Sequence, residues 1–238
     1  MRAAAAPQSA VRGALHGMRI MLRAILWDND GVLVDTEQLF YQANRELFRP
    51  LGLELSEQHF FDWYLADNCG AWHLLEPALT EAQIDEQRSG RNLRYAARLA
   101  SEHIPAIDGV AEVLASLSPR LRMGVVTSSN RDHFDIIHQR LDLVRHFEFV
   151  LTHESYTHSK PSPEPYLLGL ERLGVSAAET LVVEDSPRGL QAATAAGIRC
   201  IVLRNALTRN HRFPGAYRVV DSLPQLLAEI ELLIAALD

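Results

Sequence analysis

Short apolar stretches alternate with amphipathic stretches along most of this 238-residue chain, and this alternation restricts the fold more than any other feature. Apolar runs predict strands over 24–27, 123–126, 149–152, 181–183 and 198–203. Three-to-four spacing predicts helices over 110–117, 131–141, 163–173, 187–196 and 223–237. Because strand–helix–strand repetition favours parallel strands with helices on both faces, we expect an α/β fold with a Rossmann-like parallel sheet.

A long segment between the first predicted strand and the others has helical spacing only. Thr36, Ser56 and Thr80 are each placed to cap a helix there. We therefore expect a small all-helical cap inserted after the first strand. The predicted division is a core of residues 22–37 and 105–238 and a cap segment of residues 38–104.

The first 21 residues are rich in alanine and arginine and contain no acidic residue, a composition that resembles an organelle presequence. A disordered extension or an overextended start is the preferred interpretation. Met18 or Met21 would begin the chain just before the first predicted strand.

Composition excludes several classes of function. A formal net charge of −7 without clustered lysine and arginine argues against binding to nucleic acid or anionic membrane. The two cysteines, Cys69 and Cys200, lack metal-type spacing, as expected for reduced thiols. No apolar run approaches the roughly 20 residues that span a bilayer. We expect a cytoplasmic monomer or dimer whose partner is a small molecule.

Polar residues follow several predicted strands at their carboxyl ends. They are Asp28 with Asp30, the run Thr127–Asn130, Lys160, and the run Glu184–Ser186. Each alone has a simpler explanation, such as a solvated turn, a helix start or a surface lysine. Since the carboxyl ends of parallel strands lie along one edge of a sheet, we expect the four groups to converge.

The combined set of side chains fits phosphoryl transfer. A phosphate ester beside several carboxylates requires positive charge in a low-dielectric cleft. Carboxylate oxygens suit Mg²⁺, which supplies part of that charge, and Lys160 supplies more. Thr127 can donate to a phosphoryl oxygen as charge develops on it.

From Ala24 onward the chain resembles the haloacid dehalogenase superfamily, in particular its phosphatase and β-phosphoglucomutase-like branch with a helical cap. The resemblance rests on Asp-x-Asp-Gly at 28–31 and on the three later polar runs. It implies that Asp28 is the nucleophile, which forms an aspartyl phosphate, and that Asp30 is the general acid and base.

The resemblance also implies how a metal ion and the phosphate are held. Mg²⁺ would be bound by the carboxylates of Asp28 and Asp185 and by the backbone carbonyl of Asp30. Glu184 would bind it directly or through water. The residues expected to contact the phosphate are Asp28, Gly31, Thr127, Ser128 and Lys160.

Two positions depart from the family pattern. Ser159 stands where glycine commonly precedes the lysine, and Asn29 stands where a large apolar residue is usual. Neither change removes a reactive group. A true dehalogenase is not expected, because those enzymes lack the second aspartate and do not need metal.

The cap loop over 67–73 matches the segment with which family members recognise the leaving group. Its candidate specificity residues are Asn68, Trp72 and His73. Packing within the cap is the alternative interpretation for Trp72 and His73, and it is the preferred one for Phe40 and Trp63.

The cap residues argue against two other branches of the superfamily, the sugar phosphomutases and the phosphonate hydrolases. Related sugar phosphomutases carry a histidine near the position of Phe40 and an arginine that grips a second phosphate, where this chain has His73. Without that cationic anchor, hydrolysis is favoured over isomerisation. Phosphonate hydrolases use a cap lysine, and no lysine lies between Asp30 and Pro105.

The leading hypothesis is a Mg²⁺-dependent phosphatase acting on a sugar phosphate or a phosphorylated carboxylic acid. A sugar phosphomutase is the first alternative. The second is a non-catalytic metal- or phosphate-binding protein of the receiver type. The sequence does not identify the physiological substrate.

Overall fold

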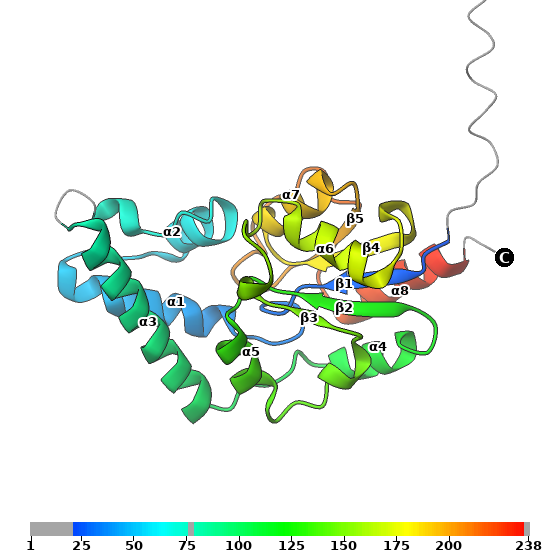
Figure 1. The fold of residues 1–238 in the computed structure, drawn as a ribbon, viewed down its shortest axis with the longest axis horizontal. Helices are drawn as coiled ribbons and strands as arrows, with labels where there is room; N and C mark the ends of the chain where they lie inside the picture. Colours follow the sequence, from blue (N-terminus) through cyan, green and yellow to red (C-terminus); the bar gives the residue numbers. More distant parts are fainter. Residues whose placement is uncertain (1–20, 76–78, 236–238) are drawn as a thin grey trace, which may run out of the picture.

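The computed structural model describes residues 21–75 and 79–235, and these form a six-stranded sheet with helices around it (Figure 1). The strand order is β3-β2-β1-β4-β5-β6, and every neighbouring pair is parallel. The strands are β1 (Ala24–Trp27), β2 (Arg122–Val126), β3 (Val150–Leu151), β4 (Thr180–Glu184), β5 (Arg199–Leu203) and β6 (Arg218–Val220). The predicted α/β class with a Rossmann-like sheet is confirmed.

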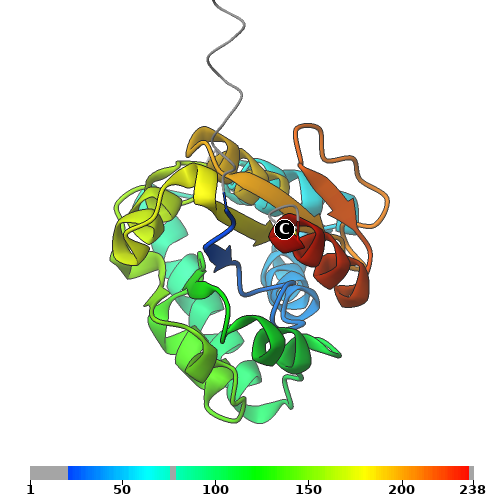
Figure 2. The same cartoon turned by 90° about the vertical axis from the view of Figure 1, so that its right-hand side faces the viewer.

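Helices cover both faces of the sheet, as Figure 1 and Figure 2 show from two directions. One face packs against α4 (Val110–Leu117), α5 (Arg131–His138) and α8 (Leu223–Ala235). The other packs against α6 (Glu164–Leu173) and α7 (Pro187–Ala195). Successive strand residues alternate between these two apolar clusters, because side chains of a strand point to opposite faces.

From α1 up to α4 the described residues contain helices but no strand. This part of the chain lies at the left of Figure 1. The helices are α1 (Glu37–Phe48), α2 (Glu57–Phe60), a π-helical turn (Phe61–Ala66) and α3 (Glu81–Ser101). Ser56 caps α2 through its side chain, and Thr80 forms a capping box with Gln83 at the start of α3, as predicted. Short 3₁₀ turns occupy Arg49–Leu51, Trp72–Leu74, Val144–His146, His153–Ser155 and Ala177–Glu179.

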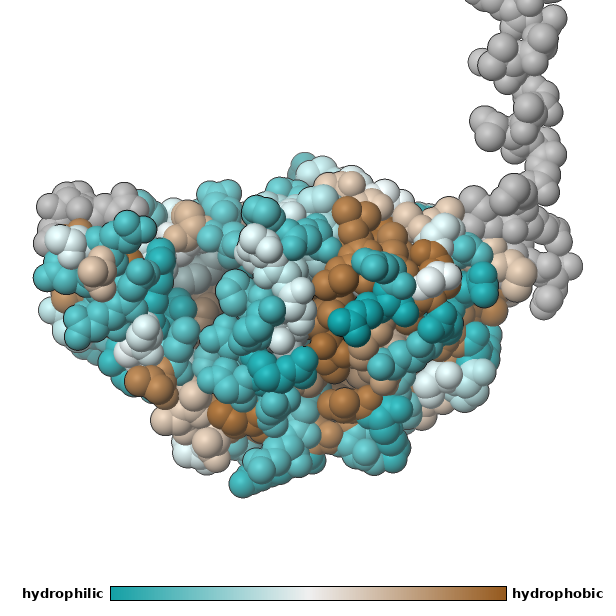
Figure 3. Space-filling view, viewed as in Figure 1, coloured by the Kyte–Doolittle hydropathy of each residue, from teal (hydrophilic) through white to brown (hydrophobic). Residues whose placement is uncertain are grey.

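The cap segment has an apolar cluster of its own. Tyr41, Phe48, Phe60, Tyr64 and Trp72 are buried in it, apart from the two clusters of the sheet. Polar residues cover the solvent side of α3 in Figure 3, whereas apolar residues gather over the sheet region at the right. Other residues of the cap segment, Ala43, Tyr95 and Leu99, pack instead in one of the clusters of the sheet.

Several bounds shift by a residue, and three elements differ more from the sequence-based expectation. Strand β6 was not predicted, because only three residues pair there and the first two of them are exposed. Helix α5 ends at His138 rather than at Leu141, and β3 is reduced to two residues at the sheet edge. The expected N-terminal extension lies almost entirely in residues 1–20, outside the described residues.

Along the described part of the chain, no helix combines the length and apolar character needed to cross a bilayer.

Candidate active site

The register of the sheet brings three polar strand ends to one level. Trp27 of β1 pairs with Val125 of β2 and with Val183 of β4. Asp28 therefore lies level with Val126, one residue before Thr127, on one side and with Glu184 on the other. Because all three strands are parallel, their carboxyl ends form one polar floor facing the cap segment.

Lys160 joins these strand ends, and it is the single lysine of the whole sequence. Its Nζ donates to Asp28 Oδ1 at 2.6 Å, to Glu184 Oε1 at 2.6 Å and to the Val126 carbonyl at 2.9 Å. All three ammonium protons are thus engaged in a side chain that is 2% exposed. Burial lowers the pKa of Lys160, but the carboxylates of Asp28 and Glu184 reverse this and raise it above its ordinary value.

Asp28 is buried among other acids. Burial first, and then the negative charge of Glu184, raise the pKa of Asp28 to about 7, although Lys160 opposes the shift. An ionised Asp28 at neutral pH consequently needs more positive charge than Lys160 provides.

Glu184 is held by hydrogen bonds on both carboxylate oxygens. Oε1 accepts from Lys160 and from the Tyr166 hydroxyl at 2.7 Å. Oε2 accepts from the Asp185 and Ser186 amides and from the Ser186 hydroxyl. A Cβ on Gly189 would lie 1.9 Å from this carboxyl group, so only glycine leaves room for it. Glu184 is therefore rigidly placed.

Asp185 occupies the space opened by Gly31. Its Oδ2 accepts from Asn205 Nδ2 at 2.7 Å, and a Cβ on Gly31 would lie 2.1 Å from the same oxygen. Gly31 has φ of +77°, and its amide donates to the Val34 carbonyl at 2.8 Å. Its amide is thus engaged within the loop and its lack of a side chain leaves room for Asp185, while the phosphate contact expected of Gly31 stays a prediction.

These carboxylates form a set that fits a hard divalent cation. One oxygen each of Asp28, Glu184 and Asp185 lies within 4.8 Å of the others. Burial, and then the charges of Glu37 and Asp28, raise the pKa of Asp185 well above its usual range. Since Glu184 already accepts on both oxygens, Asp28 and Asp185 are the better placed to bind such an ion.

The side chain of Asp30 turns away from Lys160 toward hydroxyl groups. Its Oδ2 accepts from Ser129 Oγ at 2.7 Å and from Thr127 Oγ1 at 3.3 Å. Its Oδ1 accepts from the Thr36 hydroxyl. Thr36 does precede α1, but its side chain does not cap that helix as expected; it orients Asp30 instead. No local signal marked Thr36 or Ser129 for this role.

The unusual Asn29 has a buried polar partner. Its Oδ1 accepts from His138 Nε2 at 2.7 Å, while its Nδ2 donates to Asp30 Oδ2 at 3.2 Å. Burial lowers the pKa of His138 to about 4, so the ring is neutral at pH 7. An apolar residue at position 29 would leave His138 without this partner, which gives Asn29 a structural reason in this chain.

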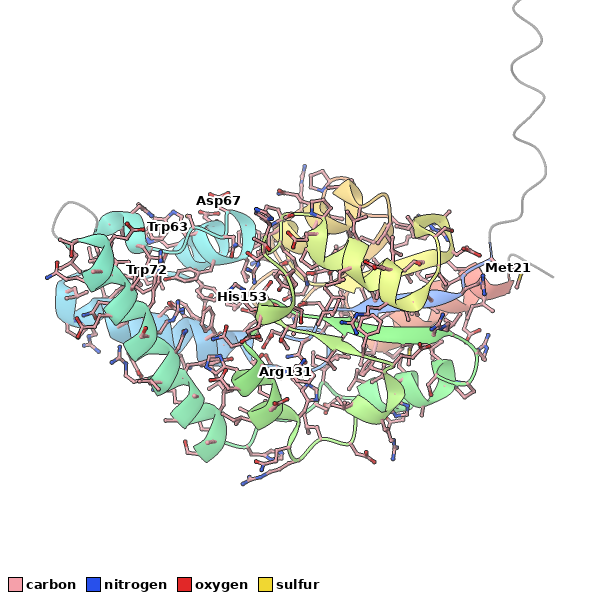
Figure 4. The ribbon with its side chains drawn as sticks, viewed as in Figure 1. Met21, Trp63, Asp67, Trp72, Arg131 and His153 are labelled. Atoms are coloured by element: carbon pink, nitrogen blue, oxygen red, sulfur yellow. The ribbon has the colours of Figure 1, made fainter. Side chains whose placement is uncertain are left out.

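A cavity of about 380 Å³ lies between the polar floor and the cap segment. The floor contributes Asp28, Asp30, Thr127, Ser128 and Asp185, and the cap segment contributes Phe40, Tyr64, Asn68, Trp72, Arg88 and Arg91. In Figure 4, Trp72 lies within the cap segment and His153 lies on the sheet side of the boundary between them. Most of the predicted site residues therefore meet around one cavity.

The three predicted cap residues differ in placement. Asn68 bridges to the core: Nδ2 donates to Ser159 Oγ and to the Lys160 carbonyl, and Oδ1 accepts from Arg188 at 2.7 Å. Trp72 is buried against Phe48 and also lines the cavity. His73 is exposed, packs edge-on against Trp63, and does not line the cavity.

Arg88 and Arg91 of α3 line the cavity and bring to it the positive charge that the cap loop lacks. Arg91 donates to Asn44 and Asn92, and its guanidinium lies over the Phe40 and Trp72 rings at 5.0 and 5.4 Å. No carboxylate of the described residues pairs with it. Positive charge thus reaches the cavity from a helix rather than from the cap loop, and the predicted preference for hydrolysis over isomerisation stays a prediction.

Comparison with known proteins supports a common family. A family model described as haloacid dehalogenase-like hydrolase matches residues 25–203. The chain is 29% identical over 228 residues to protein CbbY of Cereibacter sphaeroides, covering 87% of this chain and 94% of that protein. It is 34% identical over 183 residues to a phosphorylated carbohydrates phosphatase of Thermotoga maritima, covering 76% of this chain and 84% of that protein. A crystal structure of mutant CbbY from Rhodobacter sphaeroides with xylulose-(1,5)bisphosphate has 27% identity and a TM-score of 0.72, covering 85% and 95% of the two chains.

Proposed function

The chain belongs to the haloacid dehalogenase-like hydrolase family, and from this premise we propose that it is a Mg²⁺-dependent phosphatase of small phosphorylated sugars or related metabolites. The observation that carries the proposal is the buried contact of Lys160 with Asp28 beside Asp185. Two relatives named for phosphorylated carbohydrates or seen with a sugar bisphosphate support the substrate class.

In this proposal Asp28 attacks the phosphorus atom of the substrate. Oδ1 is fixed by Lys160, so the other carboxylate oxygen is the one left to form the bond to phosphorus. The bond from phosphorus to the leaving oxygen breaks, which gives an aspartyl phosphate and an alkoxide. When bound by Asp28 and Asp185, Mg²⁺ would supply positive charge that keeps Asp28 ionised and neutralises phosphoryl oxygens.

Asp30 is proposed to move the protons of both half-reactions. It would protonate the leaving alkoxide and then accept a proton from the water that hydrolyses the aspartyl phosphate. Hydrogen bonds from Ser129 and Thr36 hold its carboxyl group in one orientation above the floor. Thr127 and Asn29 also donate to it, so the side chain is preorganised from several sides.

Ser128 is proposed to donate to the transferred phosphate together with Thr127. The Ser128 hydroxyl is buried, lines the cavity, and has no hydrogen-bond partner within the described ranges. A phosphoryl oxygen would complete its hydrogen bonding as charge shifts onto that oxygen.

A sugar phosphomutase is a second candidate, and Arg91 is the observation that favours it. A guanidinium without a carboxylate partner in the described part of the cavity could hold the second phosphate of a bisphosphate intermediate. Phosphatase activity remains the preferred proposal, because the relative with the highest quoted identity carries that name.

Release of inorganic phosphate separates these candidates. The wild-type chain is assayed against a panel of sugar phosphates with Mg²⁺ and with a chelator, and both phosphate and isomerised sugar are measured. We expect phosphate release that depends on Mg²⁺ and falls by at least about 10³-fold in Asp28→Asn. Isomerised sugar without net phosphate would support the mutase. Wild-type turnover by Asp28→Asn would overturn both.

A further inference from the structure

Glu37 is a buried carboxyl group that the proposed chemistry does not use. It is the first residue of α1 and is 7% exposed, and it lines the cavity next to Asp30 and Arg188. Its Oε2 is buried without a hydrogen-bond partner among residues 21–75 and 79–235. A buried carboxyl oxygen without a partner is costly, so its retention calls for a ligand that completes it.

Other unpartnered polar atoms surround the same cavity. They include the Tyr64 hydroxyl from the cap segment and His133 Nε2 from α5. Both side chains are at least nine-tenths buried. Three different elements thus place incomplete hydrogen-bonding groups in the wall of one cavity, beside the floor that is proposed to hold the phosphate.

The chemistry of these atoms restricts the ligand. A hydroxyl group both donates and accepts, so it can pair with a carboxyl oxygen, a phenol and an imidazole nitrogen. An apolar ligand would leave all three incomplete. A carboxylate near Glu37 would meet the negative charges of Asp28, Asp30 and Asp185, with Arg188 as the adjacent cation.

We propose that Glu37, together with Tyr64 and His133, reads hydroxyl groups of the leaving group, so that the enzyme prefers polyhydroxylated phosphate monoesters to phosphorylated carboxylic acids. Glu37 is the specificity-determining residue of this subsite. The inference rests on the proposed phosphatase function and narrows its substrate class. It does not alter the roles of Asp28 and Lys160.

Substrate preference tests the assignment. Values of kcat/KM are measured for a hexose phosphate, a hexitol phosphate, 2-phosphoglycolate and p-nitrophenyl phosphate, with the wild type, Glu37→Ala and Glu37→Gln. The matched control is Gln38→Ala, which removes the exposed neighbour on the same helix. Glu37→Ala should lower kcat/KM for the preferred sugar or polyol phosphate by about 10- to 100-fold. For p-nitrophenyl phosphate, which has no hydroxyl groups to read, the change should stay under about 3-fold.

The conservative variant Glu37→Gln and the melting temperatures provide a second criterion. Glu37→Gln keeps an acceptor oxygen of similar reach and should recover part of the lost preference. Glu37→Ala should melt at or above the wild-type temperature, because it removes a buried carboxyl oxygen without a partner. A lower melting temperature together with equal losses on every substrate would assign Glu37 a structural role and overturn the proposal.

Binding provides a readout that is independent of turnover. In an Asp28→Asn background, a hexitol phosphate should bind about 10-fold more weakly when Glu37→Ala is added, whereas inorganic phosphate should bind equally. A wild type that prefers 2-phosphoglycolate overturns this inference but leaves the phosphatase proposal intact. A wild type that releases no phosphate from any compound overturns both.

Discussion

The cavity has a floor, formed by the carboxyl ends of the strands, and a roof, formed by the cap segment. These two regions differ in how completely their polar atoms are hydrogen-bonded. On the floor, Lys160 uses all three protons and Glu184 accepts on both oxygens, and only the Ser128 hydroxyl among the described floor groups named above is left for the transferred phosphate. On the roof and walls, Glu37, Tyr64 and His133 each keep a buried atom without a partner in the described structure. The floor is therefore preorganised before substrate arrives, while the surrounding wall is completed by the substrate.

This contrast separates reaction chemistry from substrate choice. Groups that stabilise the transferred phosphoryl must already be in place, because reorganising them during the reaction would raise the barrier. Groups that recognise the leaving group do better with hydrogen bonds still to make, since an analogue lacking a hydroxyl then leaves them incomplete. The two regions should consequently respond differently to mutation.

The largest effect is expected from Lys160→Met, which removes the cation that pairs with Asp28 and Glu184. Asp28 and Glu184 would remain buried and uncompensated, so the free energy of unfolding should fall by about 3–5 kcal/mol. Phosphatase activity should disappear as well. Urea denaturation followed by circular dichroism measures the stability change.

The control for this experiment is Arg120→Met, which breaks an exposed pair with Glu231. Its free energy of unfolding should fall by at most about 1 kcal/mol, because solvent screens that pair. Equal losses for the two variants would show that the buried floor is no more tightly coupled than the surface.

A second test adds one carbon atom to the floor at Gly31. Gly31→Ala would place a Cβ 2.1 Å from Asp185 Oδ2 at a φ of +77°. Gly52 has a φ of +76° but no neighbouring atom within 4 Å. Gly52→Ala should therefore cost only the backbone strain of about 1 kcal/mol. Gly31→Ala should lower the free energy of unfolding by about 2 kcal/mol more than Gly52→Ala does, and it should weaken metal binding. Similar melting temperatures for the two variants would contradict the packing described for Asp185.

Metal binding should depend on pH in a defined direction. The folded-state pKa of Asp28 is raised from 3.8 to about 7, so the metal-free folded protein binds more protons than the unfolded chain in this range. Its stability therefore falls as pH rises from about 4 to about 7. Mg²⁺ must displace those protons and should stabilise more at pH 8 than at pH 5.

Thermal melts with and without Mg²⁺ measure this difference. At 100 times the dissociation constant the ion should add about 2.7 kcal/mol, or roughly 5–10 °C, at pH 8. Asp185→Asn should reduce the shift. A shift as large at pH 5 as at pH 8 would argue against Asp28 as a ligand.

The smallest effect is expected at the contact between roof and floor. Asn68→Gly removes the hydrogen bonds to Ser159, the Lys160 carbonyl and Arg188, while glycine tolerates the φ of +55° found there. Because Asn68 is exposed, we expect a loss of about 3- to 10-fold in kcat/KM, mainly through KM. The neighbouring Asp67→Ala, also exposed, should change little (Figure 4). A large loss in kcat alone would place Asn68 in the chemistry rather than in closure.

Sequence analysis was most successful where the local pattern of residues alone fixes the secondary structure. The first strand and α4 were predicted with the bounds that the structure has, because their apolar spacing is complete within a few residues. Strand β6 and the end of α5 were not, since their bounds depend on pairing with distant segments. Ser56 and Thr80 cap helices as expected, whereas Thr36 serves Asp30.

By itself the sequence determined the α/β class, the family and the residue types that gather at the carboxyl edge of the sheet. Those follow from periodicity and from the rule that parallel strands end on the same side. Only the tertiary structure decided that Arg91 reaches the cavity, that His138 pairs with Asn29, and that Glu37 lacks a partner. These facts depend on side-chain directions and on contacts between elements far apart in the chain, which local spacing does not encode.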